Sequence, residues 1–282
     1  RSFSDLKKDV MGLSSGLGSM SQLMTGYYNV ISSGVEGTAN QLDVLTAASK
    51  AAKAAHIEQG AVILGLTGII DAYEGKVKSA TEAADLLFTI EKQGKTTVGE
   101  LMQYIGQLTT ASAALGISQN ELGAAFAQVT KFSGGTAFAA TQYQAVLTSL
   151  MKPSEKMTEL FKKMKVAGAE QAIQTLGLTG TLRAMQKATG GSATALAELL
   201  GSKESLLGFL ALAKGDFEGL TKSVDAFAKS AGVMDKAWVD YQGTLAAVKD
   251  TFYNTVGKFA IEFATELAPD IKLGLEGITD WL

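Results

Sequence analysis

The sequence predicts an all-α protein: a multi-helix bundle of short, Gly-separated helices followed by a long C-terminal helix. Of its 282 residues, 46% are hydrophobic and 19% are charged, which supplies enough apolar surface for a packed core. Two prolines stand against 31 glycines, so glycine rather than proline is expected to interrupt the helices. Apolar residues recur every three or four positions along most of the chain, and no convincing strand alternation occurs.

Residues 1–78 are predicted to form an N-terminal amphipathic helical region. An apolar stripe runs from Phe3 to Val35, although glycines weaken the helix that would carry it. A second helical stretch, from Gln41 to His56, is rich in alanine. It leads into the most apolar window of the chain.

That window, AVILGLTGII at 61–70, raises the question of membrane contact. It spans ten residues, whereas crossing a bilayer takes about 20. Three interpretations stay open: a buried helix, a segment that meets membrane only after a conformational change, and a standing transmembrane span. The candidate contact residues are Val62, Ile63, Leu64, Leu66, Ile69 and Ile70.

Residues 79–232 are predicted to form a core of short helices. Thr97 with Glu100 and Ser118 with Glu121 each match the capping box, in which the first side chain accepts from the amide three residues on and the glutamate reaches back. After the second box, Gly134 provides a left-handed stop. The expected helices lie at about 80–93, 98–115, 119–133, 137–151, 154–166, 180–189, 193–200, 203–213 and 217–231.

Residues 233–268 are predicted to form one long amphipathic helix, and 269–282 to begin a further segment. A 3-4 spacing of apolar residues is sustained through the helix, so one seam would face a partner. Both packing within a bundle and a coiled-coil oligomer remain possible. The seam residues are Trp238, Tyr241, Leu245, Val248, Phe252, Val256, Phe259 and Phe263.

The sequence offers little equipment for chemistry, and no enzyme, cofactor or metal site is predicted. There is no cysteine and only one histidine, His56, which argues against zinc sites and Ser-His-Asp triads. The GKT at 94–96 lacks the first glycine of a phosphate-binding loop and follows a predicted helix, so it is interpreted as a helix end and the next helix start. The net charge of −3 argues against specific nucleic-acid binding.

Several blocks, taken in order, resemble the core region of phage tail tape measure proteins over roughly residues 80–270. The first is TTVGELMQYIGQLTTASAALGISQNELGAAFAQVTKFSGG, and TAFAATQYQAVLTSLMKPSEKM follows it. The later blocks are GLTGTLRAMQKATGG, ALAELLGSKESLLGFLALAKG and AWVDYQGTLAAVKDTFYNTVGKF. The chain departs from the pattern at 165–176, where it is longer than the compact turn typical of the family. The first 78 residues match more loosely.

The resemblance implies a structural protein of the tail lumen that sets tail length during assembly and leaves ahead of the DNA. Implied partners are the tail tube protein, tail assembly chaperones, tail tip proteins and further copies of the chain, with host membrane contact at ejection. The implied location is the virion, and the host cytoplasm during assembly. The chain begins with Arg1 and looks like a fragment of a longer protein. The competing class is an α-helical pore-forming or secreted translocator protein, which would also combine Ala- and Gly-rich helices with an apolar hairpin.

Overall fold

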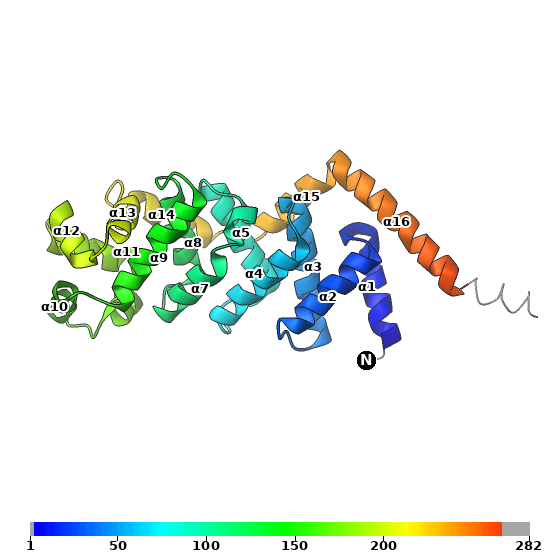
Figure 1. The fold of residues 1–282 in the computed structure, drawn as a ribbon, viewed down its shortest axis with the longest axis horizontal. Helices are drawn as coiled ribbons and strands as arrows, with labels where there is room; N and C mark the ends of the chain where they lie inside the picture. The colour runs from blue at the N-terminus through cyan, green and yellow to red at the C-terminus, as the bar shows by residue number, and fades with distance from the viewer. Residues whose placement is uncertain (1–2, 267–282) are drawn as a thin grey trace, which may run out of the picture. The chain divides into compact units, whose positions relative to one another are not determined.

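The computed structural model describes residues 3–266, and all regular structure among them is helical, as predicted (Figure 1). The helices are α1 (Phe3–Leu17), α2 (Met20–Ser32), α3 (Thr38–Ala55), α4 (Gln59–Ala72), α5 (Ala80–Gln93), α6 (Val98–Leu101), α7 (Ile105–Ala114), α8 (Gln119–Thr130), α9 (Thr136–Met151), α10 (Glu155–Lys163), α11 (Ala169–Ala188), α12 (Ala193–Leu200), α13 (Lys203–Leu212), α14 (Glu218–Phe227), α15 (Val233–Gln242) and α16 (Leu245–Glu266).

The chain divides into two compact units. The first combines Arg1–Ala54 and Glu58–Ile63 with Asp235–Leu282, and the second combines Ala55–Ile57 with Leu64–Met234. The first and last described helices, α1 and α16, therefore both belong to the first unit. The sequence analysis divided the chain differently, with boundaries after residues 78, 232 and 268. Those boundaries remain predictions.

In the first unit, α1 packs against both α2 and α16. The stripe expected to run from Phe3 to Val35 is split, because α1 ends at Leu17 and α2 begins at Met20. Ser19 caps α2 and forms a full capping box with Gln22, a start signal that the apolar periodicity concealed. Further along α2, a Cβ on the buried Gly26 would lie 2.8 Å from Leu45 of α3, so these two helices approach closely.

The second unit is organised around α8, which packs against α5, α9, α13, α14 and α7. All residues from Leu122 to Thr130 are buried, so this helix has no solvent face over its last two turns. Gly123 permits the contact with α14, because a Cβ there would lie 2.3 Å from the ring of Phe227. The glycine is thus a packing residue within a helix rather than a break between helices.

The contact of α13 with α9 also depends on a glycine. A Cβ on Gly208 would lie 2.6 Å from the carbonyl oxygen of Gln142 and 2.9 Å from Val146, both on α9. Backbone therefore meets backbone at this crossing without a side chain between the helices. Nearby, Phe209 of α13 packs edge-on against Phe217, with ring centroids 6.0 Å apart.

Both predicted capping boxes are present. Thr97 with Glu100 starts α6, and Ser118 with Glu121 starts α8. The GKT motif at 94–96 lies between two helices, as expected: Gly94 is the C-cap of α5, and Thr97 is the N-cap of α6. At its end, α8 stops earlier than expected, so Phe132 lies beyond the helix and is half exposed.

Several predicted helices differ in their bounds, and three of them differ most. The element expected at 98–115 is interrupted by a turn at 102–104 between α6 and α7. The helix expected at 180–189 begins at Ala169, but it is kinked at Gly177, where φ is +69°. The single helix expected from 234 to 268 is replaced by α15 and α16, separated at Gly243 and Thr244.

The break between α15 and α16 has a local cause. The hydroxyl of Thr244 accepts a hydrogen bond from the amide of Ala247 at 3.2 Å, as an N-cap does. Gly243 immediately before it lowers helix propensity. The prediction of one continuous helix followed the apolar spacing, which continues through both helices, and gave too little weight to these two local signals. Residues 267–268 and the further segment at 269–282 lie outside the described residues.

Candidate interaction surfaces

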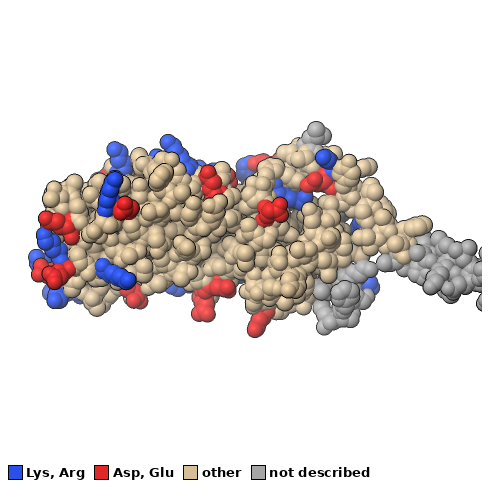
Figure 2. Space-filling view, viewed as in Figure 1, with Lys and Arg blue, Asp and Glu red and all other residues tan. Residues whose placement is uncertain are grey.

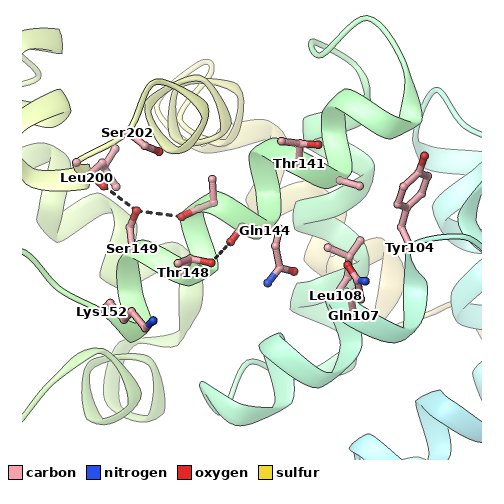
Figure 3. Close-up of a pocket in the computed structure, with 13 residues that line it drawn as sticks. Tyr104, Gln107, Leu108, Thr141, Gln144, Thr148, Ser149, Lys152, Leu200 and Ser202 are labelled. Atoms are coloured by element: carbon pink, nitrogen blue, oxygen red, sulfur yellow. Dashed lines mark hydrogen bonds between the residues drawn. The ribbon is translucent and has the colours of Figure 1, made fainter.

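The second unit carries an open groove of about 660 Å³ beside α9 (Figure 3). In Figure 3, Tyr104 lies at the right of the groove, and Lys152 and Leu200 lie at the left. Between them the side chains are mainly amides and hydroxyls. They include Gln107, Thr141, Gln144, Thr148, Ser149 and Ser202. Sequence reasoning missed this groove, because its wall combines residues about 100 positions apart that carry no motif.

Hydrogen bonds fix several of these polar side chains. The Ser149 hydroxyl donates to the carbonyl of Leu200 at 2.7 Å, which ties α9 to the end of α12. Thr148 donates to the carbonyl of Gln144 at 2.8 Å. Oε1 of Gln144 is buried and has no hydrogen-bond partner among the described residues. Tyr104 and Lys152 are the titratable residues among those that line the groove.

The surface around the groove is nearly free of charge. Between residues 101 and 151 the sequence has two charged residues, Glu121 and Lys131. Glu121 is occupied by its capping box and by the amide of Leu178, to which Oε1 accepts at 2.7 Å. Figure 2 shows the corresponding contrast: acidic and basic side chains gather over α10 and α12, whereas uncharged side chains cover most of the face over α7 and α9.

The apolar window at 61–70 forms part of α4, and most of it is inside the protein. Val62, Ile63, Leu66 and Ile69 are fully buried, and Ile70 is partly buried. Leu64 differs, with 67% of its surface exposed. Among the described residues, no helix is both long and apolar enough to span a bilayer. Membrane contact by these six residues stays a prediction.

The eight predicted seam residues fall into two groups. On α15, Trp238 and Tyr241 are buried and stack on each other with ring centroids 5.4 Å apart. On α16 the seam residues from Val248 onward are exposed, each by between 51% and 66%. They are Val248, Phe252, Val256, Phe259 and Phe263. The side chain of Leu245 lies outside the described residues. The structure thus brings the first two into a core and leaves the other five on the surface.

A polar cluster joins α15 and α16 to α3. The carboxylate of Asp250 accepts from Nζ of Lys53 at 2.6 Å and from the hydroxyl of Tyr241 at 3.0 Å. The bond from Lys53 lowers the pKa of Asp250 below its ordinary value. Burial, together with the bonded Asp250, raises the pKa of Tyr241 to about 12. A second ion pair, Lys50 with Asp235 at 3.0 Å, links α3 to α15.

A buried carboxylate holds the start of α15. Asp85 of α5 accepts from the amides of Gly232 and Met234, both at 2.8 Å. Its side chain is thereby satisfied by backbone donors, as buried charged groups require. Residues 3–266 contain no cluster of three or more His, Cys, Asp or Glu side chains that could hold a metal ion.

Comparisons with known proteins agree on one class. Residues 7–201 match a family model described as "Phage-related minor tail protein". The chain is also 25% identical over 283 aligned positions to a probable tape measure protein of Clostridium phage phiCD119. That alignment covers 96% of this chain and 30% of the relative, so the chain spans less than a third of the relative's length. No solved structure matches it significantly.

Proposed function

The chain belongs to the family of phage-related minor tail proteins, and from this premise we propose that it is part of a tail tape measure protein. In this role it is a structural component of the tail lumen, sets tail length during assembly and leaves ahead of the DNA at ejection. Its partners are the tail tube protein, the tail assembly chaperones and the tail tip proteins. It is present in the host cytoplasm during assembly and in the virion afterwards.

The observation that carries this proposal is similarity along nearly the whole chain to a probable tape measure protein, combined with a fold made of helices. A helix has a fixed rise of about 1.5 Å per residue, so helical length is proportional to residue number. Drawn out as a single helix, 282 residues would span about 420 Å. Since the chain is 30% as long as its relative, the parent protein would set the total length.

The low charge supports a position in the lumen. DNA passing through the same channel would be retained by a dense track of Lys and Arg, because cations bind phosphates strongly at moderate salt. The chain has 25 basic and 28 acidic residues, and the stretch of sequence between 101 and 151 has only two charged residues. Such a surface lets DNA follow without holding it.

The test is a length series in the gene for the parent protein. One variant deletes residues 64–234, about 170 residues, and a second duplicates them. If helical rise sets length, electron microscopy of tails will show them about 260 Å shorter and about 260 Å longer, respectively. A control replaces the segment by an unrelated helix-forming sequence of equal length. Unchanged length in the duplication variant, or a changed length in the equal-length control, would contradict the proposal.

Membrane contact at ejection is a separate part of the proposal. Because four of the six candidate residues are buried, α4 must leave its core before it can enter a bilayer. Liposome flotation of the chain at native and at partly denaturing temperature tests this. Leu64→Asp changes the exposed position and leaves the core intact, so it should not alter flotation if opening is required. Flotation at native temperature that is lost in Leu64→Asp would show direct surface binding instead, and flotation at neither temperature would exclude the contact.

A further inference from the structure

The groove beside α9 is lined by a row of side chains from one face of that helix. Thr141, Gln144, Thr148 and Lys152 follow one another at intervals of three, four and four positions. Residues with this spacing are neighbours on a helix surface, so the row extends for about 16 Å. The volume of about 660 Å³ falls within the range of small-molecule sites. The groove is therefore large enough for an elongated ligand.

The hydroxyl groups of the groove act as acceptors towards a ligand, because their hydrogens are used within the protein. Thr141 and Thr148 each donate to the backbone carbonyl four positions earlier, at 3.1 and 2.8 Å. Ser149 likewise donates to backbone carbonyls, and Ser202 donates to the hydroxyl of Ser205 at 2.9 Å. A hydroxyl has one hydrogen and two lone pairs, so each of these oxygens can still accept.

The side chain of Gln144 adds a further acceptor in the middle of the row (Figure 3). Its Oε1 atom is buried and has no hydrogen-bond partner among the described residues. An unsatisfied buried acceptor costs about 1–3 kcal/mol. A ligand that donates a hydrogen bond to this oxygen would remove that cost. The wall formed by α9 is thus complementary to a ligand rich in hydrogen-bond donors.

We propose that the groove binds a neutral oligosaccharide. Each sugar hydroxyl can rotate to donate to the acceptors of α9, and its lone pairs can still accept from Lys152 or Gln107. The carbonyls of an extended peptide cannot donate, and phosphates bring acceptors to a wall of acceptors. Leu108 and the ring of Tyr104 provide apolar surface for the C–H face of a sugar ring. This inference does not depend on the role in the tail.

Nuclear magnetic resonance of the full chain, labelled with nitrogen-15, tests the binding. The probes are maltotriose, cellotriose and the trimer of N-acetylglucosamine, each titrated to about 10 mM. At least one should bind with a dissociation constant of about 1 mM or below. Shift changes should be confined to residues 104–108, 141–152 and 200–202, which include the lining of the groove. Failure of all three probes to bind, or shift changes centred elsewhere, would overturn the proposal.

Paired threonine variants test the acceptor wall. Thr141→Val/Thr148→Val removes two acceptors from exposed positions and keeps the branched shape, so binding should weaken about tenfold or more. Thr141→Ser/Thr148→Ser keeps both hydroxyls and should bind as wild type does. The matched control is Thr110→Val/Thr175→Val, two exposed threonines outside the groove that also donate to the carbonyl four positions earlier. Unchanged binding by the first variant, or equal weakening in the control, would contradict the proposal. Circular dichroism verifies that all variants keep their helix content.

An uncharged peptide tests the main alternative ligand. A hexapeptide of alternating glycine and alanine with blocked ends presents backbone donors and carbonyls without side-chain hydroxyls. It should bind at least about tenfold more weakly than the best trisaccharide. Tighter binding of the peptide, with the same loss in Thr141→Val/Thr148→Val, would assign the groove to a polypeptide and refute the proposed sugar ligand.

Discussion

Replacement of Gly208 by alanine tests whether backbone contact between α13 and α9 holds the second unit together. The new Cβ would lie 2.6 Å from the carbonyl oxygen of Gln142, about 1 Å closer than the ~3.5 Å at which such atoms attract. A second contact, with Val146 at 2.9 Å, limits movement along the crossing. The helices must therefore separate, and overpacking of this kind costs about 1–3 kcal/mol.

Gly68→Ala provides the matched control. Gly68 also lies inside a helix of the second unit, and a Cβ there would meet no atom within 4 Å. Both substitutions gain about 0.5–1 kcal/mol of helix propensity, so the difference between the two variants isolates the overpacking. We expect Gly68→Ala to be slightly more stable than wild type. Gly208→Ala should be about 1–3 kcal/mol less stable than Gly68→Ala.

Urea unfolding followed by circular dichroism gives this difference from the shift of the midpoint at a common slope. Hydrogen exchange measured by mass spectrometry places it in the structure, since α9 and α13 should lose protection in Gly208→Ala alone. Equal stability of the two variants, or loss of protection spread evenly over the unit, would refute the reasoning.

Three other predictions concern polar groups. Asp85→Ala removes the acceptor for two amides at the start of α15, so it should lower the free energy of unfolding by about 1–3 kcal/mol. Hydrogen exchange at residues 230–236 should then become faster, and unchanged exchange there would contradict the prediction. Glu121→Gln weakens both the cap of α8 and the bond to Leu178, so exchange should rise at both places, whereas a rise at α8 alone would deny the second role. Tyr241 keeps its proton to about pH 12 in the folded chain but loses it near 10 when unfolded, so stability falls as pH rises from about 10 to 12. Tyr241→Phe should remove this part of the alkaline loss in urea titrations, and an identical pH profile in both proteins would count against it.

Local signals in the sequence determined the helical class and many of the helix starts. Ser118 and Glu121 predict the start of α8 because both partners of a capping box lie within four residues, so no distant contact is needed. Local signals also determine Gly94 as the C-cap of α5 and Thr97 as the N-cap of α6. These two caps explain the GKT sequence at 94–96 without a phosphate-binding role. The family resemblance likewise needed only the order of sequence blocks, and the match to minor tail proteins confirmed it.

Other features depend on residues far apart in the chain, and only the tertiary structure decided them. At the kink of α11, the carboxylate of Glu121, more than 50 positions earlier, accepts from the amide of Leu178 and lies 2.8 Å from where a Cβ on Gly177 would be. The sequence of α11 alone does not specify this kink. The groove beside α9 is likewise built where α9 meets the end of α12, a contact that no motif encodes.

The apolar spacing of α16 was fixed by the sequence, but its direction was not. Periodicity shows that a helix has an apolar face, whereas the partner of that face depends on which surface is free elsewhere in the fold. Here Asp250 accepts from Lys53 of α3 and from Tyr241 of α15, so the side of α16 that carries Asp250 faces these two helices. The sequence by itself thus determined the helices and their faces. Tertiary structure decided which faces meet within the chain and which stay exposed, because that choice depends on contacts between distant residues.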